Sequence, residues 1–183
     1  IGGWDSDFTH LGRQGEGSLW LTSGQELWFI GGSPHYAIGR HYDLHRLGFL
    51  VSVLQASPPA GGGTWVVATG DRRRSGLVAE FDPDSGSIIR KFELRGGSGT
   101  ITDAERFIIA GSGSAIVRID PRTGRTRTRH LVGTPGGLAS SGDRIWWTSG
   151  GGAVNCLLVH ELTDCGTVYV PRATTLSSDR RFL

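Results

Sequence analysis

Methionine is absent from this 183-residue chain, lysine occurs only once, at Lys91, and cysteine occurs only twice. No apolar run approaches the roughly 18 residues that span a bilayer, so we expect no membrane insertion in this segment. The formal net charge of +2 is close to balance and gives no reason to expect a nucleic-acid partner. Because the chain starts at Ile1 and lacks methionine, we interpret it as a piece of a longer protein.

Complete catalytic signatures are missing as well. The sequence has no Gly-x-Ser-x-Gly elbow and no Cys-x-x-Cys pair, and no helical pattern follows the glycine runs 61–63 and 150–152 to make them phosphate loops. These absences favour a non-catalytic protein over an enzyme and predict no cofactor, with a divalent metal as the alternative. Thirty glycines and seven prolines indicate many turns instead of long helices.

The sequence does contain a repeat. Between the stretches 75–112 and 114–150, matching residues lie 38 positions apart without a gap, as Asp82 and Asp120 do. The matching positions are Phe81-Asp82-Pro83 with Ile119-Asp120-Pro121, Gly86 with Gly124, Arg106 with Arg144 and Phe107 with Ile145. A fixed period between about 20 and 50 residues, made of short β runs and turn signals, predicts stacked supersecondary units.

Each unit has the same internal order. A nearly continuous apolar run such as Phe107-Ile-Ile-Ala-Gly111 predicts a strand buried on both faces near a central axis, and an alternating strand follows it. Asp-Pro-x-x-Gly then predicts a hairpin turn, and a polar strand such as 125–129 suits an outer edge. We therefore predict an all-β fold: one β-propeller domain over residues 1–183, with about four blades of four antiparallel strands. We expect these blades to be a segment of a larger ring, and a closed ring of four blades is the alternative. The expected repeats are 27–64, 65–106, 107–144 and 145–181.

The two turns, Phe81-Asp-Pro-Asp-Ser-Gly86 and Ile119-Asp-Pro-Arg-Thr-Gly124, resemble the repeats of bacterial YVTN- and PQQ-type β-propellers. The resemblance covers about four consecutive units. Leu27-Trp-Phe-Ile30 followed by Ala37-Ile-Gly-Arg40 also resembles, more weakly, a blade of the streptogramin (virginiamycin B) lyase group. Ile89-Arg90 stands where PQQ blades carry a Leu-Trp pair, so the resemblance does not imply a quinone. The superfold hosts lyases, dehydrogenases, scaffolds and receptors, and so leaves the activity open.

A histidine-rich segment is the main candidate for chemistry. His41, Asp43 and His45 project to one face of an extended segment, and imidazole with carboxylate is a possible set of metal ligands. The alternative is that Asp43 caps a turn, because the repeat places it on Asp82 and Asp120. The lyase resemblance implies a general-base histidine on a channel-facing loop, which makes His35 the candidate catalytic residue and His41 and His45 the candidate metal ligands.

Two further sets of residues are candidates for ligand binding. Arg72, Arg73 and Arg74 lie in a loop that is longer than its counterpart at residues 111–114, and they could bind a carboxylate or phosphate. The alternative is a solvated loop without a ligand. Trp147 replaces a residue equivalent to Ile109 and could line the channel, whereas packing between blades is the alternative. Cys156 and Cys165 flank an expected hairpin, where they form either a disulfide, which would indicate an oxidising compartment, or two free thiols.

Three functions are consistent with these patterns. The first is a non-catalytic binding or scaffold module that presents blade-face loops to a protein, glycan or small-molecule ligand. The second is a metal-assisted lyase or hydrolase with its site at the axial channel. The third is an extracytoplasmic sensor domain of a larger protein. In each case we expect an extracytoplasmic or secreted location, and the remaining blades would come from the parent chain or from a second copy.

Overall fold

The structure is a computed structural model that describes residues 8–14, 18–23, 26–31, 37–43, 49–56, 64–70, 75–82, 85, 87–96, 98–149, 151–173 and 176. The regular elements in these ranges are sixteen β-strands. No helix in the described ranges has the length and apolarity needed to cross a membrane.

The strands form four sheets of four strands each. The first sheet contains β1 (Phe8–Gln14), β2 (Ser18–Ser23), β3 (Glu26–Gly31) and β4 (Ala37–Asp43). The second contains β5 (Phe49–Ala56), β6 (Thr64–Gly70), β7 (Ser75–Phe81) and β8 (Ile88–Arg95). The third contains β9 (Ser98–Ala104), β10 (Phe107–Ser112), β11 (Ala115–Ile119) and β12 (Thr126–His130). The fourth contains β13 (Leu138–Ser141), β14 (Arg144–Thr148), β15 (Ala153–Leu158) and β16 (Asp164–Tyr169).

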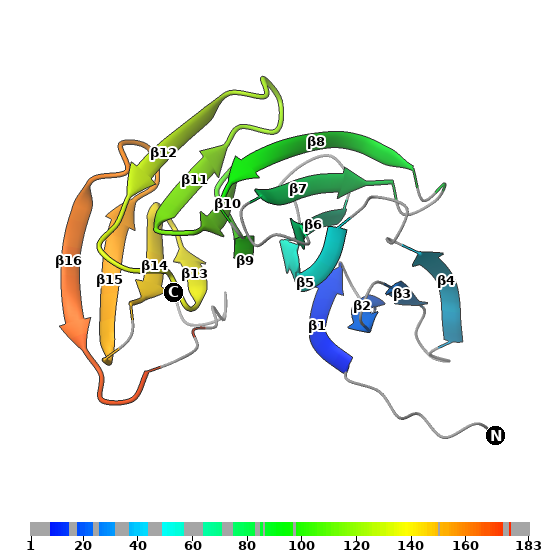
Figure 1. Cartoon of the computed structure of the whole chain (residues 1–183), viewed down its shortest axis with the longest axis horizontal. Coiled ribbons are helices and arrows are strands. Elements are labelled where there is room, and N and C mark those ends of the chain that lie inside the picture. Colours follow the sequence, from blue (N-terminus) through cyan, green and yellow to red (C-terminus); the bar gives the residue numbers. More distant parts are fainter. Residues whose placement is uncertain are drawn as a thin grey trace.

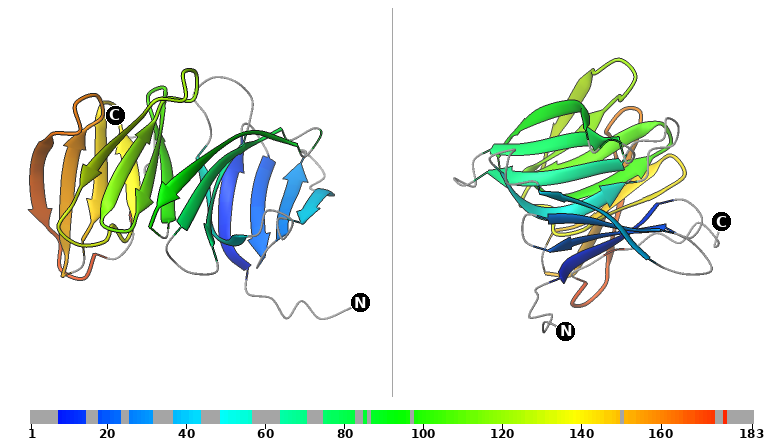
Figure 2. Two further views of the ribbon diagram at one scale, coloured as in Figure 1. Left: turned by 45° about the horizontal axis from the view of Figure 1, so that its top comes forward. Right: turned by 90° about the vertical axis from the view of Figure 1, so that its right-hand side faces the viewer.

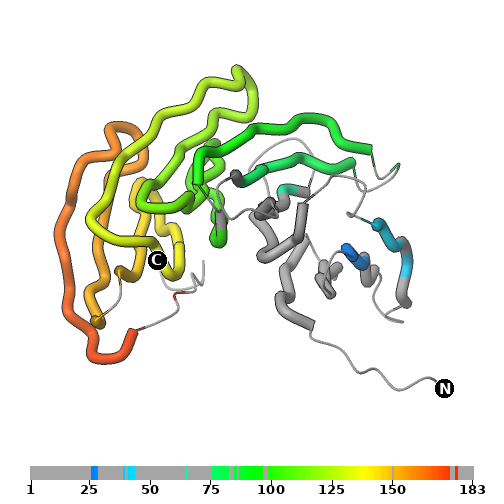
Figure 3. The backbone as a smooth tube through the Cα atoms, in the orientation of Figure 1, coloured from blue at the N-terminus to red at the C-terminus, as the bar shows by residue number. Residues whose placement is uncertain are grey.

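Successive strands within every sheet pair antiparallel, so each sheet is a simple up-and-down meander. The four sheets follow one another along an arc, with the first strand of each sheet on the inside and the last on the outside (Figure 1). The inner strands contact each other in chain order: β1 with β5, β5 with β9, and β9 with β13. Two further views show the same succession of sheets (Figure 2), and the coloured part of the backbone tube follows the second, third and fourth sheets from green to orange (Figure 3). Four-stranded antiparallel sheets arranged in this radial way are the blades of a β-propeller.

The third sheet packs against a neighbouring sheet on each face, and because successive side chains of a strand point to opposite sides, its strands contribute to both cores. One face packs against the second sheet, in a cluster that includes Trp65, Ile108 and Ile119. The other face packs against the fourth sheet, where Phe107, Ile109 and Ile116 meet Ile145, Trp147 and Leu157. Every residue of β10 is buried, which explains its unbroken apolar sequence. The expected position of this strand needs one correction, because β10 lies second from the inside and β9 is the strand nearest the axis.

The turn between β11 and β12 has the chemistry that its sequence predicts. The carboxylate of Asp120 accepts hydrogen bonds from the backbone N–H groups of Arg122 and Thr123, at 2.9 and 3.3 Å. Gly124 has a φ of +71° and donates its N–H to the carbonyl of Asp120. Burial raises the pKa of Asp120, but the hydrogen bonds from Arg122 and Thr123 outweigh it and hold the pKa below its ordinary value.

The sheets and the expected repeats begin at different strands. The repeats at 65, 107 and 145 start at the second strand of a sheet, whereas the repeat at 27 starts at the third strand of the first sheet. A ring of repeated units can be divided at any strand, so the sheets do not decide where a sequence repeat starts. The repeat bounds stay a prediction.

Glu80 on β7 provides a pH-dependent contribution to stability. Its side chain is buried at 8% exposure, and its Oε2 lies 3.7 Å from Nε of the half-exposed Arg90. Burial raises the pKa of this carboxyl and the charge of Arg90 opposes the rise. Because the folded chain then binds the proton more tightly than the unfolded chain, this contribution is present below the ordinary pKa and is lost as the pH rises through the raised pKa.

We expect Glu80→Gln to remove that part of the pH dependence. Urea unfolding between about pH 4 and about pH 8 should show the wild-type chain losing stability with rising pH relative to the variant. Glu93→Gln, at an exposed position on β8, is the matched control and should follow the wild type. Parallel curves for the wild type and Glu80→Gln would contradict the prediction.

Candidate functional site

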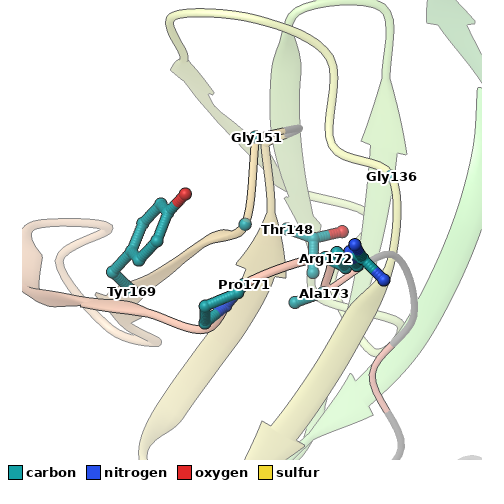
Figure 4. Close-up of a pocket in the computed structure, with 8 residues that line it drawn as sticks. Gly136, Thr148, Gly151, Tyr169, Pro171, Arg172 and Ala173 are labelled. Carbon is teal, nitrogen blue, oxygen red and sulfur yellow. The ribbon is translucent and has the colours of Figure 1, made fainter.

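An open pocket of about 570 Å³ lies at one end of the fourth sheet (Figure 4). Its lining comes from the end of β14, the β14–β15 turn, the segment after β16 and the approach to β13. The lining residues are Gly136, Thr148, Gly151, Gly152, Tyr169, Pro171, Arg172 and Ala173. Figure 4 shows Tyr169 on one side, Arg172 and Ala173 beside Thr148 on the other, and Pro171 between them. The pocket is therefore lined by an aromatic side chain (Tyr169), aliphatic side chains (Pro171 and Ala173) and a cationic group (Arg172).

A close backbone approach shapes this end of the sheet. Gly152 has a φ of +88° and its carbonyl accepts the N–H of Val170 at 2.8 Å. A Cβ atom at position 152 would lie only 2.6 Å from the carbonyl oxygen of Val170, so a larger residue would push the two segments apart. Glycine at this position thus holds the chain after β16 against the β14–β15 turn and forms the pocket.

Arg172 is presented by a tight turn. The N–H of Ala173 donates to the carbonyl of Val170 at 3.0 Å, which closes a four-residue turn. Pro171 occupies the second position and Arg172 the third, with a φ of +65°. Proline followed by a positive φ is the pattern of a type II turn, whose third position usually holds glycine. The exposed Arg172 side chain makes no ion pair or hydrogen bond with the described part of the chain.

Exposed apolar side chains continue from the pocket onto the outer strand. Val168, Tyr169 and Val170, here called the β16 patch, are 53, 70 and 45% exposed. The corresponding outer strand of the third sheet, β12, is also fully exposed, but it is the polar sequence Thr-Arg-Thr-Arg-His. A charged outer strand resists pairing with other chains, and the second half of β16 lacks that protection.

A second cluster joins the third and fourth sheets at the opposite end of the blades. The guanidinium of Arg118 on β11 donates from one nitrogen to the carbonyls of Val159 and His160, at 2.9 Å for Val159. It also lies over the ring of Phe107, with 4.5 Å between Cζ and the ring centroid. Burial, followed by the charges of Arg127 and Arg106, lowers the pKa of Arg118. These contacts tie β11 to the β15–β16 turn.

Further charged groups surround this contact. Arg129 forms an ion pair of 2.8 Å with Asp164, and Arg127 donates to the carbonyl of His160 at 3.3 Å. Nε2 of His160 lies 2.9 Å from a carboxylate oxygen of Glu105. Two arginines of the polar strand expected at residues 125–129 therefore reach the neighbouring blade. Because the cations have partners, we assign this cluster to the joining of blades.

Of the three histidine candidates, the structure describes His41. His35 and His45 lie outside the described residues, as do Arg72, Arg73 and Arg74. His41 lies on β4, where its Nε2 is 3.1 Å from Glu26 and its ring stacks on Trp28 with centroids 4.2 Å apart. Among the described residues, no group of three or more histidine, cysteine or acidic side chains is placed to hold a metal ion. The metal-binding role of His41 and His45 and the catalytic role of His35 stay predictions.

Two other candidates lie in the fourth sheet. Trp147 is 5% exposed and belongs to the core between the third and fourth sheets, a placement that fits the packing alternative, and its ligand-binding role stays a prediction. Cys156 on β15 and Cys165 on β16 form a disulfide in the structure, with Cα atoms 5.1 Å apart. The bond joins the exposed outer strand to the buried strand beside it.

Sequence reasoning did not identify Tyr169, Pro171 and Arg172 as site residues. The available signal was weak: an apolar run, Val168-Tyr-Val170, ends in a Pro-Arg pair with no glycine to complete the turn. A type II turn usually has glycine after its proline, so a Pro-Arg pair is an unusual sequence for this turn.

No protein-family model matches the sequence, and no curated protein matches it. Solved structures do show similar folds. The chain is similar to the Pan2 WD40 domain of Neurospora crassa, with a TM-score of 0.60 and 11% identity over 97% of this chain. It is also similar to apo AztD from Citrobacter koseri, with a TM-score of 0.65 and 14% identity over 87% of this chain. A chain of the mitotic checkpoint complex matches with a TM-score of 0.68 and 14% identity over 92% of this chain.

At these identities the likeness shows the fold, which is a β-propeller. The chain spans 71% of the Pan2 domain, 46% of AztD and 52% of the mitotic checkpoint chain. The comparisons do not bear on the resemblance to YVTN- and PQQ-type repeats, which stays a prediction.

Proposed function

We propose that this chain is a non-catalytic β-propeller binding module that presents the pocket end of its fourth sheet to a protein partner. The observation that carries the proposal is an open pocket of about 570 Å³ whose lining includes Tyr169, the exposed aromatic residue of the β16 patch. Exposed apolar side chains beside a pocket are typical of interaction sites on otherwise polar proteins. The loops of a propeller supply such surfaces without altering its core.

The chemistry of the pocket favours a protein over a glycan. A sugar carries many hydroxyl groups that must exchange hydrogen bonds when they leave water. Here the lining residues are mainly glycines and apolar residues. The polar side-chain groups of the lining are the hydroxyl of Thr148, the phenol of Tyr169 and the guanidinium of Arg172. Apolar side chains of a protein segment match this lining better.

We also propose that the module works in an oxidising compartment, outside the cytoplasm. The disulfide between Cys156 and Cys165 supports this location, because such bonds persist mainly in secreted and extracytoplasmic proteins.

Site-specific cross-linking tests the proposed function. The photoreactive amino acid p-benzoylphenylalanine would replace Tyr169, whose exposed aromatic side chain it resembles. Irradiation in extracts and secreted fractions of the source cells should yield a discrete cross-linked protein, identified by mass spectrometry. The matched control carries the same group in place of Val132, which is 98% exposed and does not line the pocket.

We expect the species at position 169 to be absent at position 132, and excess unlabelled chain to compete with it. Identical patterns at the two positions would contradict the proposal, as would cross-links to glycan alone.

A further inference from the structure

Three residues other than glycine have a positive φ in the described part of the chain: Glu105 at 51°, Leu162 at 52° and Arg172 at 65°. A side chain with a Cβ atom is disfavoured in this conformation, and glycine would remove the strain. Non-glycine residues persist at such positions when their surroundings require the side chain. The three residues can therefore be compared by what their side chains do.

The first two side chains have structural partners. The carboxylate of Glu105 lies 2.9 Å from Nε2 of His160 and so connects the third sheet to the fourth. Leu162 is 2% exposed and packs in the core between the same sheets, with Ile145 and Leu157 among its neighbours. A glycine at either position would lose an inter-blade contact, which accounts for the strained backbone.

Arg172 differs from these two residues in its surroundings. Its side chain is exposed, it lines the pocket, and within the described residues it makes neither an ion pair nor a hydrogen bond. A guanidinium is well suited to bind a carboxylate through two parallel hydrogen bonds. Building on the function proposed above, we infer that Arg172 binds a carboxylate of the protein partner, from an aspartate or glutamate side chain next to an apolar residue.

The surroundings of Arg172 determine this ligand chemistry. Tyr169 stands across the pocket with Pro171 between it and Arg172 (Figure 4), and Val168 and Val170, its neighbours in the chain, are also exposed apolar residues. An apolar side chain resting on Tyr169 and Pro171 places an adjacent acidic side chain beside Arg172. One guanidinium balances the single charge of a carboxylate, whereas phosphorylated segments are usually bound by clusters of arginines. The partner segment is therefore an acidic–apolar peptide.

Capped, fluorescently labelled hexapeptides that place Asp or Glu beside Phe, Leu or Val are the probes. Fluorescence anisotropy with the full chain should show saturable binding, and the same peptides with Asn or Gln should bind at least about tenfold more weakly. Arg172→Gly should cause a similar loss while its melting temperature stays equal to or above that of the wild type, because glycine relieves the turn. Arg172→Lys should retain part of the affinity.

Arg122→Ala, which removes an exposed arginine from the turn at the other end of the blades, is the charge-matched control and should bind like the wild type. Equal binding of acidic and amide peptides, unchanged binding by Arg172→Gly, or tighter binding of phosphoserine peptides would each overturn the inference. So would the absence of binding by all acidic–apolar peptides to the folded chain. If Tyr169 still captures a partner in that last case, the proposed function stands and only the ligand class is wrong.

Discussion

Replacing Arg118 by alanine is expected to lower the free energy of unfolding by about 2–4 kcal/mol, because the variant loses two charged hydrogen bonds and a cation–π contact at once. The carbonyl of Val159, a fully buried residue, loses its hydrogen-bond donor in the variant. For a chain of this length, we expect the melting temperature to fall by about 5–15 °C. Differential scanning calorimetry and urea unfolding would measure both quantities.

A control and a double-mutant cycle separate this contact from a general loss of charge. Arg122→Ala removes an exposed arginine and should change stability by less than about 0.5 kcal/mol. In a cycle with Phe107→Leu, Arg118→Ala should cost less when the aromatic ring is already gone, with a coupling energy of at least about 0.5 kcal/mol. Additive effects, or an Arg118→Ala chain as stable as the wild type, would show that Arg118 does not hold the blades together.

Contacts of this kind could not be inferred from the sequence. Arg118 and Val159 are 41 residues apart, and nothing in the local pattern of either segment links them. The polar strand expected at residues 125–129 indicates an outer edge, but it does not indicate that Arg127 and Arg129 reach His160 and Asp164 on the next blade. A pattern along one strand reports which side chains share a face, whereas the partner of that face depends on how the blades pack.

The fold itself was largely predictable from the sequence, and the physical reason lies in the repeats. Alternating apolar residues and Asp-Pro-x-x-Gly turns specify strands and hairpins through local chemistry, as the turn at Asp120 shows. The offset of 38 residues then requires that each unit packs on its neighbours. The prediction of an all-β propeller built from four-stranded blades is confirmed by the sheets and by the similar solved structures.

The strand at which each sheet begins was harder to predict. The inner strands β9 and β13 have the sequences SGTITDA and LASS, whose small and polar residues give little strand signal. The expected repeats that start at residues 27 and 145 match β3 to β14, yet β3 lies third in its sheet and β14 second. A period alone does not say which strand starts a sheet, because the same spacing results from every starting point.

The pocket depends on backbone conformations that the sequence does not reveal. Arg172 adopts a positive φ because the chain after β16 is held against Gly152, and that constraint comes from the folded sheet. The pattern Pro171-Arg172 on its own predicts only that a turn begins. The segments with the histidine and arginine candidates at 35, 45 and 72–74 lie outside the described residues, so those candidates stay predictions.

Reduction of the disulfide between Cys156 and Cys165 is expected to cost about 2–3 kcal/mol of stability, the loop-closure value for a bond between residues nine positions apart. The melting temperature should fall by about 5–10 °C when a reductant is added. The effect should be largest at β16, because every residue of this strand is exposed and the ion pair that joins it to the neighbouring blade, Arg129 with Asp164, is exposed as well. Hydrogen exchange should therefore rise more at β16 than at β11.

The double variant Cys156→Ala/Cys165→Ala provides the control, since it should melt like the reduced wild type and should no longer respond to the reductant. Two reactive thiols in the denatured, unreduced chain would contradict the disulfide directly. Reduction should also weaken the binding of acidic–apolar peptides, because Tyr169 ends β16 and the Arg172 turn follows it. Peptide affinity that survives reduction while β16 exchanges freely would show that the pocket does not depend on this strand.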